Sequence, residues 1–145
     1  MKLPAIERTL QKTFQWIKEI QEELGTDNER MAWHALRSVL HHLRDRLTVN
    51  EAVQLAAELP MLIRGLYYEG WRPSIVPIKI RHREEFLDLI RKDFQRNPDV
   101  DPEKIVRAVW NVMKRHVASG ELEDILSLLP KEIREIFEES GGTSA

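Results

Sequence analysis

Residues 37–47 read RSVLHHLRDRL, and residues 107–117 read RAVWNVMKRHV. The two segments align without a gap when the chain is shifted by 70 residues against itself. With Leu36 and Val106 just before them, the apolar residues of both segments recur at alternating steps of four and three. This is the spacing of one face of an α-helix. The stretch therefore predicts two equivalent helices, each with one buried apolar stripe.

The match extends outward from these helices to residues 16–69 and 86–139, where nine of the 54 aligned positions are identical. At most other core-like positions one apolar residue replaces another, as at Trp16 and Phe86 or Leu40 and Trp110. Units of this kind cannot each bury an apolar face alone, so they pack against one another. We therefore predict an all-α fold of two tandem four-helix repeats, packed together with pseudo-two-fold character.

The boundaries of the repeats follow from local signals. Pro4 can begin a helix that Gly25 ends, Asp27 can cap the next helix, and Thr48 with Glu51 forms a capping-box signature. We expect a single domain over residues 1–145, with internal repeats at 5–70 and 82–140. We expect residues 71–81 to form an extended connector, with a short self-paired strand as the alternative, and residues 141–145 to form a disordered tail.

Composition limits the class of protein. The chain has 145 residues, a net charge of −2 and no cysteine, which excludes disulfides and thiolate metal ligands. No segment approaches the roughly 18 apolar residues of a membrane span, and residues 1–25 are too charged for a signal peptide. We expect a cytoplasmic protein without membrane contact. The balanced charge does not favour nucleic-acid binding, although the basic segment 72–83 leaves weak binding through the connector as a third functional hypothesis.

The residues that could carry chemistry do not form a recognisable pattern. His34 and His41 share a helix face but lie about 10.5 Å apart, and none of the five histidines has the i, i+4 spacing of a helical metal pair. The sequence contains no glycine-rich phosphate loop and no paired Glu-x-x-His motif. We therefore expect no catalytic residue, no metal and no cofactor, and hence a protein that is not an enzyme.

Cationic side chains border the apolar stripe in both copies. They are His34, Arg37, His41 and Arg44 in the first copy, and Lys104, Arg107 and Lys114, with the neutral Asn111, at the matching positions. The structural interpretation is a solvated charged stripe with repeated ion pairs, Arg37 with Glu51 and Arg107 with Glu121. The functional alternative is a small-molecule or anion-binding protein in which arginines converge between the two repeats; the candidate contacts are Arg37, Arg64, Arg107 and Arg134.

Aromatic residues gather where the two repeats join. Tyr67, Tyr68 and Trp71, with Arg64 one helical turn earlier, form a candidate binding surface for a protein partner. The simpler interpretation is that they hold the repeats together. Tyr67 matches the apolar Phe137, whereas the positions that match Tyr68 and Trp71 are not apolar. Tyr68 and Trp71 are therefore the stronger candidates for an asymmetric contact.

Three stretches give the chain a family resemblance: RSVLHHLRDRL at residues 37–47, LPMLIRGLYYEGW at 59–71 and HREEF at 82–86. The chain resembles a bacterial family catalogued as domain of unknown function family 2267. The resemblance implies a small helical protein of two similar halves, and it transfers no activity and no catalytic residues. The leading functional hypothesis is a non-enzymatic helical interaction module that binds a protein partner or self-associates.

Overall fold

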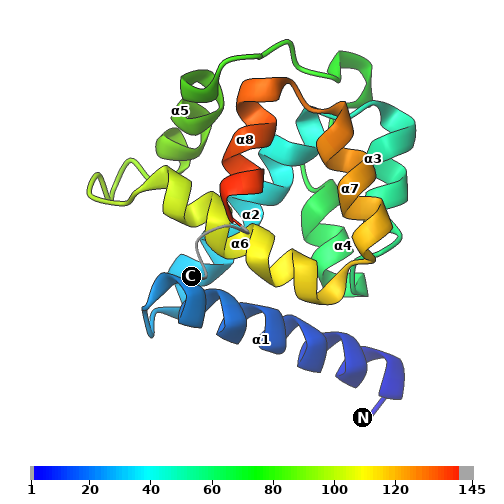
Figure 1. Ribbon diagram of the computed structural model, residues 1–145. Helices are drawn as coiled ribbons and strands as arrows, with labels where there is room; N and C mark the ends of the chain where they lie inside the picture. Colours follow the sequence, from blue (N-terminus) through cyan, green and yellow to red (C-terminus); the bar gives the residue numbers. More distant parts are fainter. Residues whose placement is uncertain (1, 141–145) are drawn as a thin grey trace.

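The computed structural model describes residues 2–140, and these residues form eight α-helices without any strand (Figure 1). The predicted all-α class is confirmed. The predicted tail at 141–145 lies outside the described residues. The helices are α1 (Pro4–Leu24), α2 (Glu29–Asp45), α3 (Val49–Ala56), α4 (Met61–Tyr68), α5 (Arg83–Asp93), α6 (Pro102–His116), α7 (Ser119–Leu128) and α8 (Lys131–Ser140), with a short 3-10 helix, η1, at Pro73–Ile75.

The helix ends follow the signals in the sequence with one exception. Gly25 ends α1 in the left-handed region at φ 69°, where glycine carries no steric penalty. The Thr48 hydroxyl accepts from the Glu51 amide while the Glu51 carboxylate accepts from the Thr48 amide, which is the predicted capping box of α3. The predicted cap at Asp27 was wrong by one residue, because the Asn28 side chain accepts from the third amide of α2.

The core lies where α2 and α6 meet. The helix α1 packs on α2 and α6, and α5 packs on the same two helices. The helix α4 packs on α2, and α8 packs on α6. Apolar positions that align in the two halves of the sequence are buried in both: Trp16 and Phe86, Ile20 and Ile90, Leu36 and Val106, Leu40 and Trp110, Leu43 and Met113, Leu55 and Ile125, Ile63 and Ile133, Tyr67 and Phe137.

The connector is irregular apart from η1 and contains no strand. It is fastened to the end of α2, because the Ile78 amide donates to the Asp45 carbonyl at 2.7 Å and the Arg46 guanidinium donates to the Ile78 carbonyl. Beyond the connector, Arg83 at the start of α5 forms ion pairs with Glu103 and Glu139, each at 3.1 Å. One of the basic side chains of the segment 72–83 is therefore neutralised by carboxylates of the protein itself.

The first helix of each half differs in length, and this difference positions the candidate site. The helix α1 has 21 residues and α5 has 11. Because α5 begins at residue 83, its counterpart in α1 begins at residue 13, and residues 4–12 align with the connector instead. The N-terminal half of α1 is therefore an extension beyond the aligned unit, and it runs along one side of the molecule near the start of α4 (Figure 1).

Candidate functional site

The predicted pair between Arg37 and Glu51 was wrong. Arg37 Nη2 lies 2.7 Å from Glu69 Oε1 at the end of α4, and both side chains are about half exposed. Glu51 is instead held in the capping box of α3 by the Thr48 amide. Because Glu51 recurs at the same spacing in both copies, the sequence suggested a partner on the next helix. The packing of α4 on α2 instead brings the carboxylate of Glu69 to Arg37.

The predicted counterpart pair, Arg107 with Glu121, was also wrong. Arg107 Nη1 lies 3.4 Å from Glu103 Oε2, one turn earlier on α6. Burial, together with the negative charges of Asp124 and Glu58, raises the pKa of Glu121 above that of an ordinary glutamate. A carboxylate held by an arginine would show the opposite shift. In both predicted ion pairs the acidic residue was therefore wrong. Each arginine pairs with another carboxylate of its own half of the chain.

The four arginines of the anion hypothesis do not share a cavity. Arg37 and Arg107 are paired as described, and Arg134 Nε lies 3.8 Å from Glu138 Oε1. Arg64 donates from Nε to the Ala56 carbonyl and from Nη2 to the Leu59 carbonyl, each at 2.9 Å, and so caps the end of α3. The predicted convergence of these arginines between the repeats was therefore wrong.

The predicted aromatic surface is largely part of the core. Tyr67 is fully buried, its hydroxyl donates to the Ala52 carbonyl at 2.8 Å, and burial raises its pKa. The prediction of Tyr67 as a surface residue was wrong. Tyr68 and Trp71 are partly buried against the core, with their ring centroids 5.4 Å apart. This cluster packs against the core and is therefore only partly accessible to a partner.

The cationic stripe of α2 lines a groove of about 460 Å³, but Arg37, His41 and Arg44 are engaged with groups of the protein itself. Arg44 is only 3% exposed and donates from Nη1 to the Tyr67 carbonyl at 2.7 Å and the Glu69 carbonyl at 2.9 Å. His41 Nε2 donates to the Leu66 carbonyl at 2.7 Å, and burial lowers the pKa of this histidine. The stripe therefore satisfies the carbonyls at the end of α4, which a helix otherwise leaves without partners.

A serine, an aspartate and a histidine meet at the far end of the same groove. Ser38 Oγ donates to Asp93 Oδ2 at 2.7 Å, and His42 Nε2 contacts the same oxygen at 2.8 Å. Burial acts to raise the pKa of Asp93, but these two hydrogen bonds hold it below the ordinary value. Nucleophilic catalysis requires the serine to contact the histidine, and here both contact the carboxylate. The cluster fastens α5 to α2.

The histidines and carboxylates of the described residues do not gather in a metal-binding arrangement. Within residues 2–140, no group of three or more such side chains is placed to hold a metal ion. The sites that the sequence singled out thus contain internal ion pairs and helix-end contacts.

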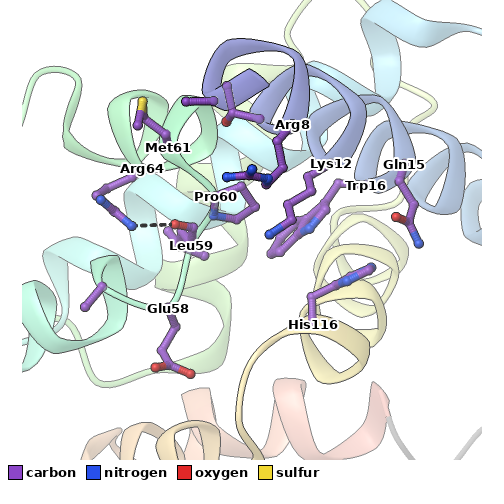
Figure 2. Close-up of a pocket in the computed structure, with 13 residues that line it drawn as sticks. Arg8, Lys12, Gln15, Trp16, Glu58, Leu59, Pro60, Met61, Arg64 and His116 are labelled. Carbon is purple, nitrogen blue, oxygen red and sulfur yellow. Dashed lines mark hydrogen bonds between the residues drawn. The ribbon is translucent and has the colours of Figure 1, made fainter. Parts of the chain in front are cut away.

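A cleft that the sequence did not predict lies along the N-terminal half of α1 and has a volume of about 540 Å³ (Figure 2). We refer to it as the α1 cleft. Its walls are α1, the turn between α3 and α4 with the first turn of α4, and the last residue of α6. Arg8 and Lys12 extend into it from α1, with Pro60 on one side and His116 on the other (Figure 2).

The inner end of the α1 cleft is rigid. The rings of Trp16 and His116 stack with centroids 5.1 Å apart and an interplanar angle of 23°. His116 Nε2 lies 3.0 Å from Glu19 Oε1, which also pairs with Arg115 at 3.3 Å. Burial acts to raise the pKa of Glu19, but hydrogen bonds from His116, Arg115 and Gln15 lower it below the ordinary value. The end of α6 is thus fastened to α1.

The same half of α1 is fixed to α4 by Thr9. The amide of Leu62, at the start of α4, donates to Thr9 Oγ1 at 2.9 Å. The Thr13 hydroxyl donates to the Thr9 carbonyl at 2.7 Å. Because Thr9 satisfies one of the free amides at the start of α4, the position of α1 over α4 is set by a specific contact.

Apolar side chains are exposed on the flank of α1 away from the cleft. On a helical wheel of about 100° per residue they lie roughly 80–160° from Trp16, while Arg8 and Lys12 lie on its other side. Two more exposed apolar residues, Met61 and Leu62, lie at the start of α4, where the Leu62 amide contacts Thr9 and Met61 also lines the α1 cleft. We define the α1 apolar face as these six residues, which are 40–63% exposed: Leu3, Ile6, Leu10, Phe14, Met61 and Leu62.

Sequence reasoning missed this surface because Ile6, Leu10 and Phe14 continue the apolar spacing of the buried Ile17 and the partly buried Leu24. Spacing alone does not tell an exposed stripe from a buried one. The available signal was the alignment itself, because residues 4–12 have no helical counterpart in the second half.

The model of the family described as "Uncharacterized conserved protein (DUF2267)" matches residues 13–136, so the chain belongs to this family. A search of curated proteins gave no match. None of the helices within residues 2–140 has the length and apolar character needed to cross a membrane.

Proposed function

We propose that the protein is a non-enzymatic helical interaction module that self-associates, and that a second copy of the chain docks on the α1 apolar face. One observation carries the proposal. Four large apolar side chains at helical spacing are exposed in and just before the N-terminal half of α1, and Phe14, just inside the part of α1 that matches α5, is 63% exposed. Apolar patches of this kind on soluble proteins mark interaction surfaces.

We also propose that the two halves form a duplicated unit with pseudo-two-fold packing. In the alignment α1 corresponds to α5 and α2 corresponds to α6. The contact of α1 with α6 therefore corresponds to the contact of α5 with α2, and both contacts exist. Likewise, the packing of α4 on α2 corresponds to that of α8 on α6. In this arrangement the aligned unit completes the core without residues 4–12. The extension is then free to carry an interface.

The size of the α1 apolar face suits a homodimer at the lower end of the stable range. Full side chains of this kind have roughly 150–200 Å² of surface, so exposed fractions of 40–63% give about 450–600 Å² of apolar surface per copy. Two copies would bury about 900–1,200 Å² before flanking polar residues are counted, and a biological interface needs about 1,000 Å² in total.

Symmetry and charge also support a second copy as the partner. A two-fold dimer uses the same patch on both subunits, and the stripes of two antiparallel α1 helices can face one another. The net charge of −2 over 145 residues offers little repulsion between copies. We expect a reversible dimer at protein concentrations of about 100 µM, because interfaces of this size are weak.

Sedimentation velocity over a concentration series tests the proposal. The wild-type chain should shift from monomer to dimer, and the double variant Leu10→Ser, Phe14→Ser should remain a monomer. The matched control is Val53→Ser, Leu128→Ser, because these residues are exposed to a similar degree on α3 and α7. The control should dimerise like the wild type. A wild-type chain that stays monomeric throughout the series would reject the proposal, and so would equal weakening in both variants.

A further inference from the structure

The α1 cleft carries an inference that does not depend on self-association. Three of its lining residues are formally cationic, Arg8, Lys12 and Arg64, and one is acidic, Glu58. With histidine counted as neutral, the lining has a formal charge of +2 in a protein whose net charge is −2. The cleft is therefore a local concentration of positive charge.

The cations of the cleft are available to a ligand. Within the part of the chain that the structure describes, the side chains of Arg8 and Lys12 form no ion pair or hydrogen bond. Arg64 uses Nε and Nη2 for backbone carbonyls and leaves Nη1 uncommitted among the described residues. Glu58 is held in the wall, because its Oε1 accepts from the Ala118 amide at 3.2 Å. The other arginines discussed are paired with carboxylates or donate to backbone carbonyls.

The positions of the three cationic side chains favour phosphate over carboxylate as the ligand group. Arg8 and Lys12 lie one helical turn apart, about 6 Å along α1, and Arg64 belongs to the opposite wall (Figure 2). A carboxylate offers two oxygens in one plane, whereas a phosphate group offers acceptor oxygens in three directions. Donors from two walls therefore suit phosphate better. A volume of about 540 Å³ is within the usual range for small-molecule sites.

We propose that the α1 cleft binds a small ligand that carries phosphate groups, with Arg8 and Lys12 of α1 and Nη1 of Arg64 as the contacts to phosphate oxygens. The ligand could be inorganic or a phosphate ester, and the phosphate chemistry is common to both. Trp16 is fully covered in the floor of the cleft and is stacked on His116. It therefore supports the site but offers no ring face on which a nucleotide base could stack.

Titration of the full-length protein followed by amide NMR spectra tests this proposal, with inorganic pyrophosphate, ADP and citrate as separate probes. We expect pyrophosphate to shift the amides of the cleft, and we expect added salt to weaken its binding. The double variant Arg8→Gln, Lys12→Gln should bind pyrophosphate at least about tenfold more weakly. The control Lys18→Gln, Lys79→Gln removes the same charge from exposed positions outside the cleft and should bind within about twofold of the wild type.

The other outcomes separate the possible ligands. A tighter complex with ADP than with pyrophosphate supports a phosphate ester as the ligand, and equal affinities support inorganic phosphates. The proposal is overturned if pyrophosphate and ADP shift no cleft amide at about 10 mM, if citrate binds as tightly as pyrophosphate, or if the control variant loses as much affinity as the cleft variant. Because the cleft variant changes only exposed side chains without partners, its circular dichroism spectrum should match the wild type.

Discussion

Replacement of Arg44 by methionine should destabilise the fold strongly, because this arginine is buried and serves three acceptors. Arg44 donates to two carbonyls at the end of α4 and to Asp45 Oδ1 at 2.8 Å. Methionine keeps the apolar stem but leaves the carbonyls of Tyr67 and Glu69 without a donor. Each lost hydrogen bond to a charged group costs about 1.5–3 kcal/mol, and breaking one partner of a buried charged network costs about 3–5 kcal/mol in total.

Urea unfolding followed by far-ultraviolet circular dichroism measures this loss. A decrease of about 3–5 kcal/mol corresponds to a Tm lower by about 6–15 °C for a chain of this size. The control is Arg115→Met, whose ion pairs with Glu19 and Glu23 involve a side chain that is nearly half exposed. The control should change the free energy of unfolding by less than about 1 kcal/mol. A loss in Arg44→Met no larger than that of the control would refute the reasoning.

Three further perturbations follow from the described contacts. Tyr67→Phe removes the only hydroxyl donor to the Ala52 carbonyl among the described residues and should cost about 1–2 kcal/mol in urea unfolding. Thr48→Ala removes the capping box of α3 and should cost about 0.5–2 kcal/mol by the same assay, while Thr26→Ala, outside any capping box, should cost less. The pKa of His41 is lowered in the folded protein, so below about pH 6.5 the unfolded chain takes up a proton more readily and stability falls on acidification. Unfolding at about pH 7.5 and about pH 5.5 should show a smaller acid-induced loss in His41→Gln than in the wild type.

The sequence predicted the helices because their signals are local. The spacing of Leu36, Leu40 and Leu43 defines one face of α2, and these residues are fully buried. The capping box at Thr48 needs only residues three positions apart, and it was predicted correctly. Periodicity and helix-end chemistry act over one or two turns, so they can be read from a single chain.

The contacts between helices could not be read in the same way. Arg44 borders the stripe of α2 on a helical wheel, and nothing near it in the sequence indicates that the carbonyls of Tyr67 and Glu69 surround its guanidinium. Nothing near Arg37 in the sequence marks Glu69 as its partner, and the packing of α4 on α2 brings the two side chains together. The α1 cleft depends on three elements meeting, and no sequence motif marks it.

Disulfide trapping tests the central claim, that a second copy docks on the α1 apolar face, most directly. The chain contains no cysteine, so one introduced cysteine is a unique reporter. Gln11 is exposed on α1 beside the stripe and close to Leu10, where an antiparallel pair of helices would bring equivalent residues together. Gln11→Cys should form a covalent dimer on mild oxidation, and Lys79→Cys, in the exposed connector, should form no covalent dimer. Equal cross-linking of the two variants, or none in Gln11→Cys, would contradict the account.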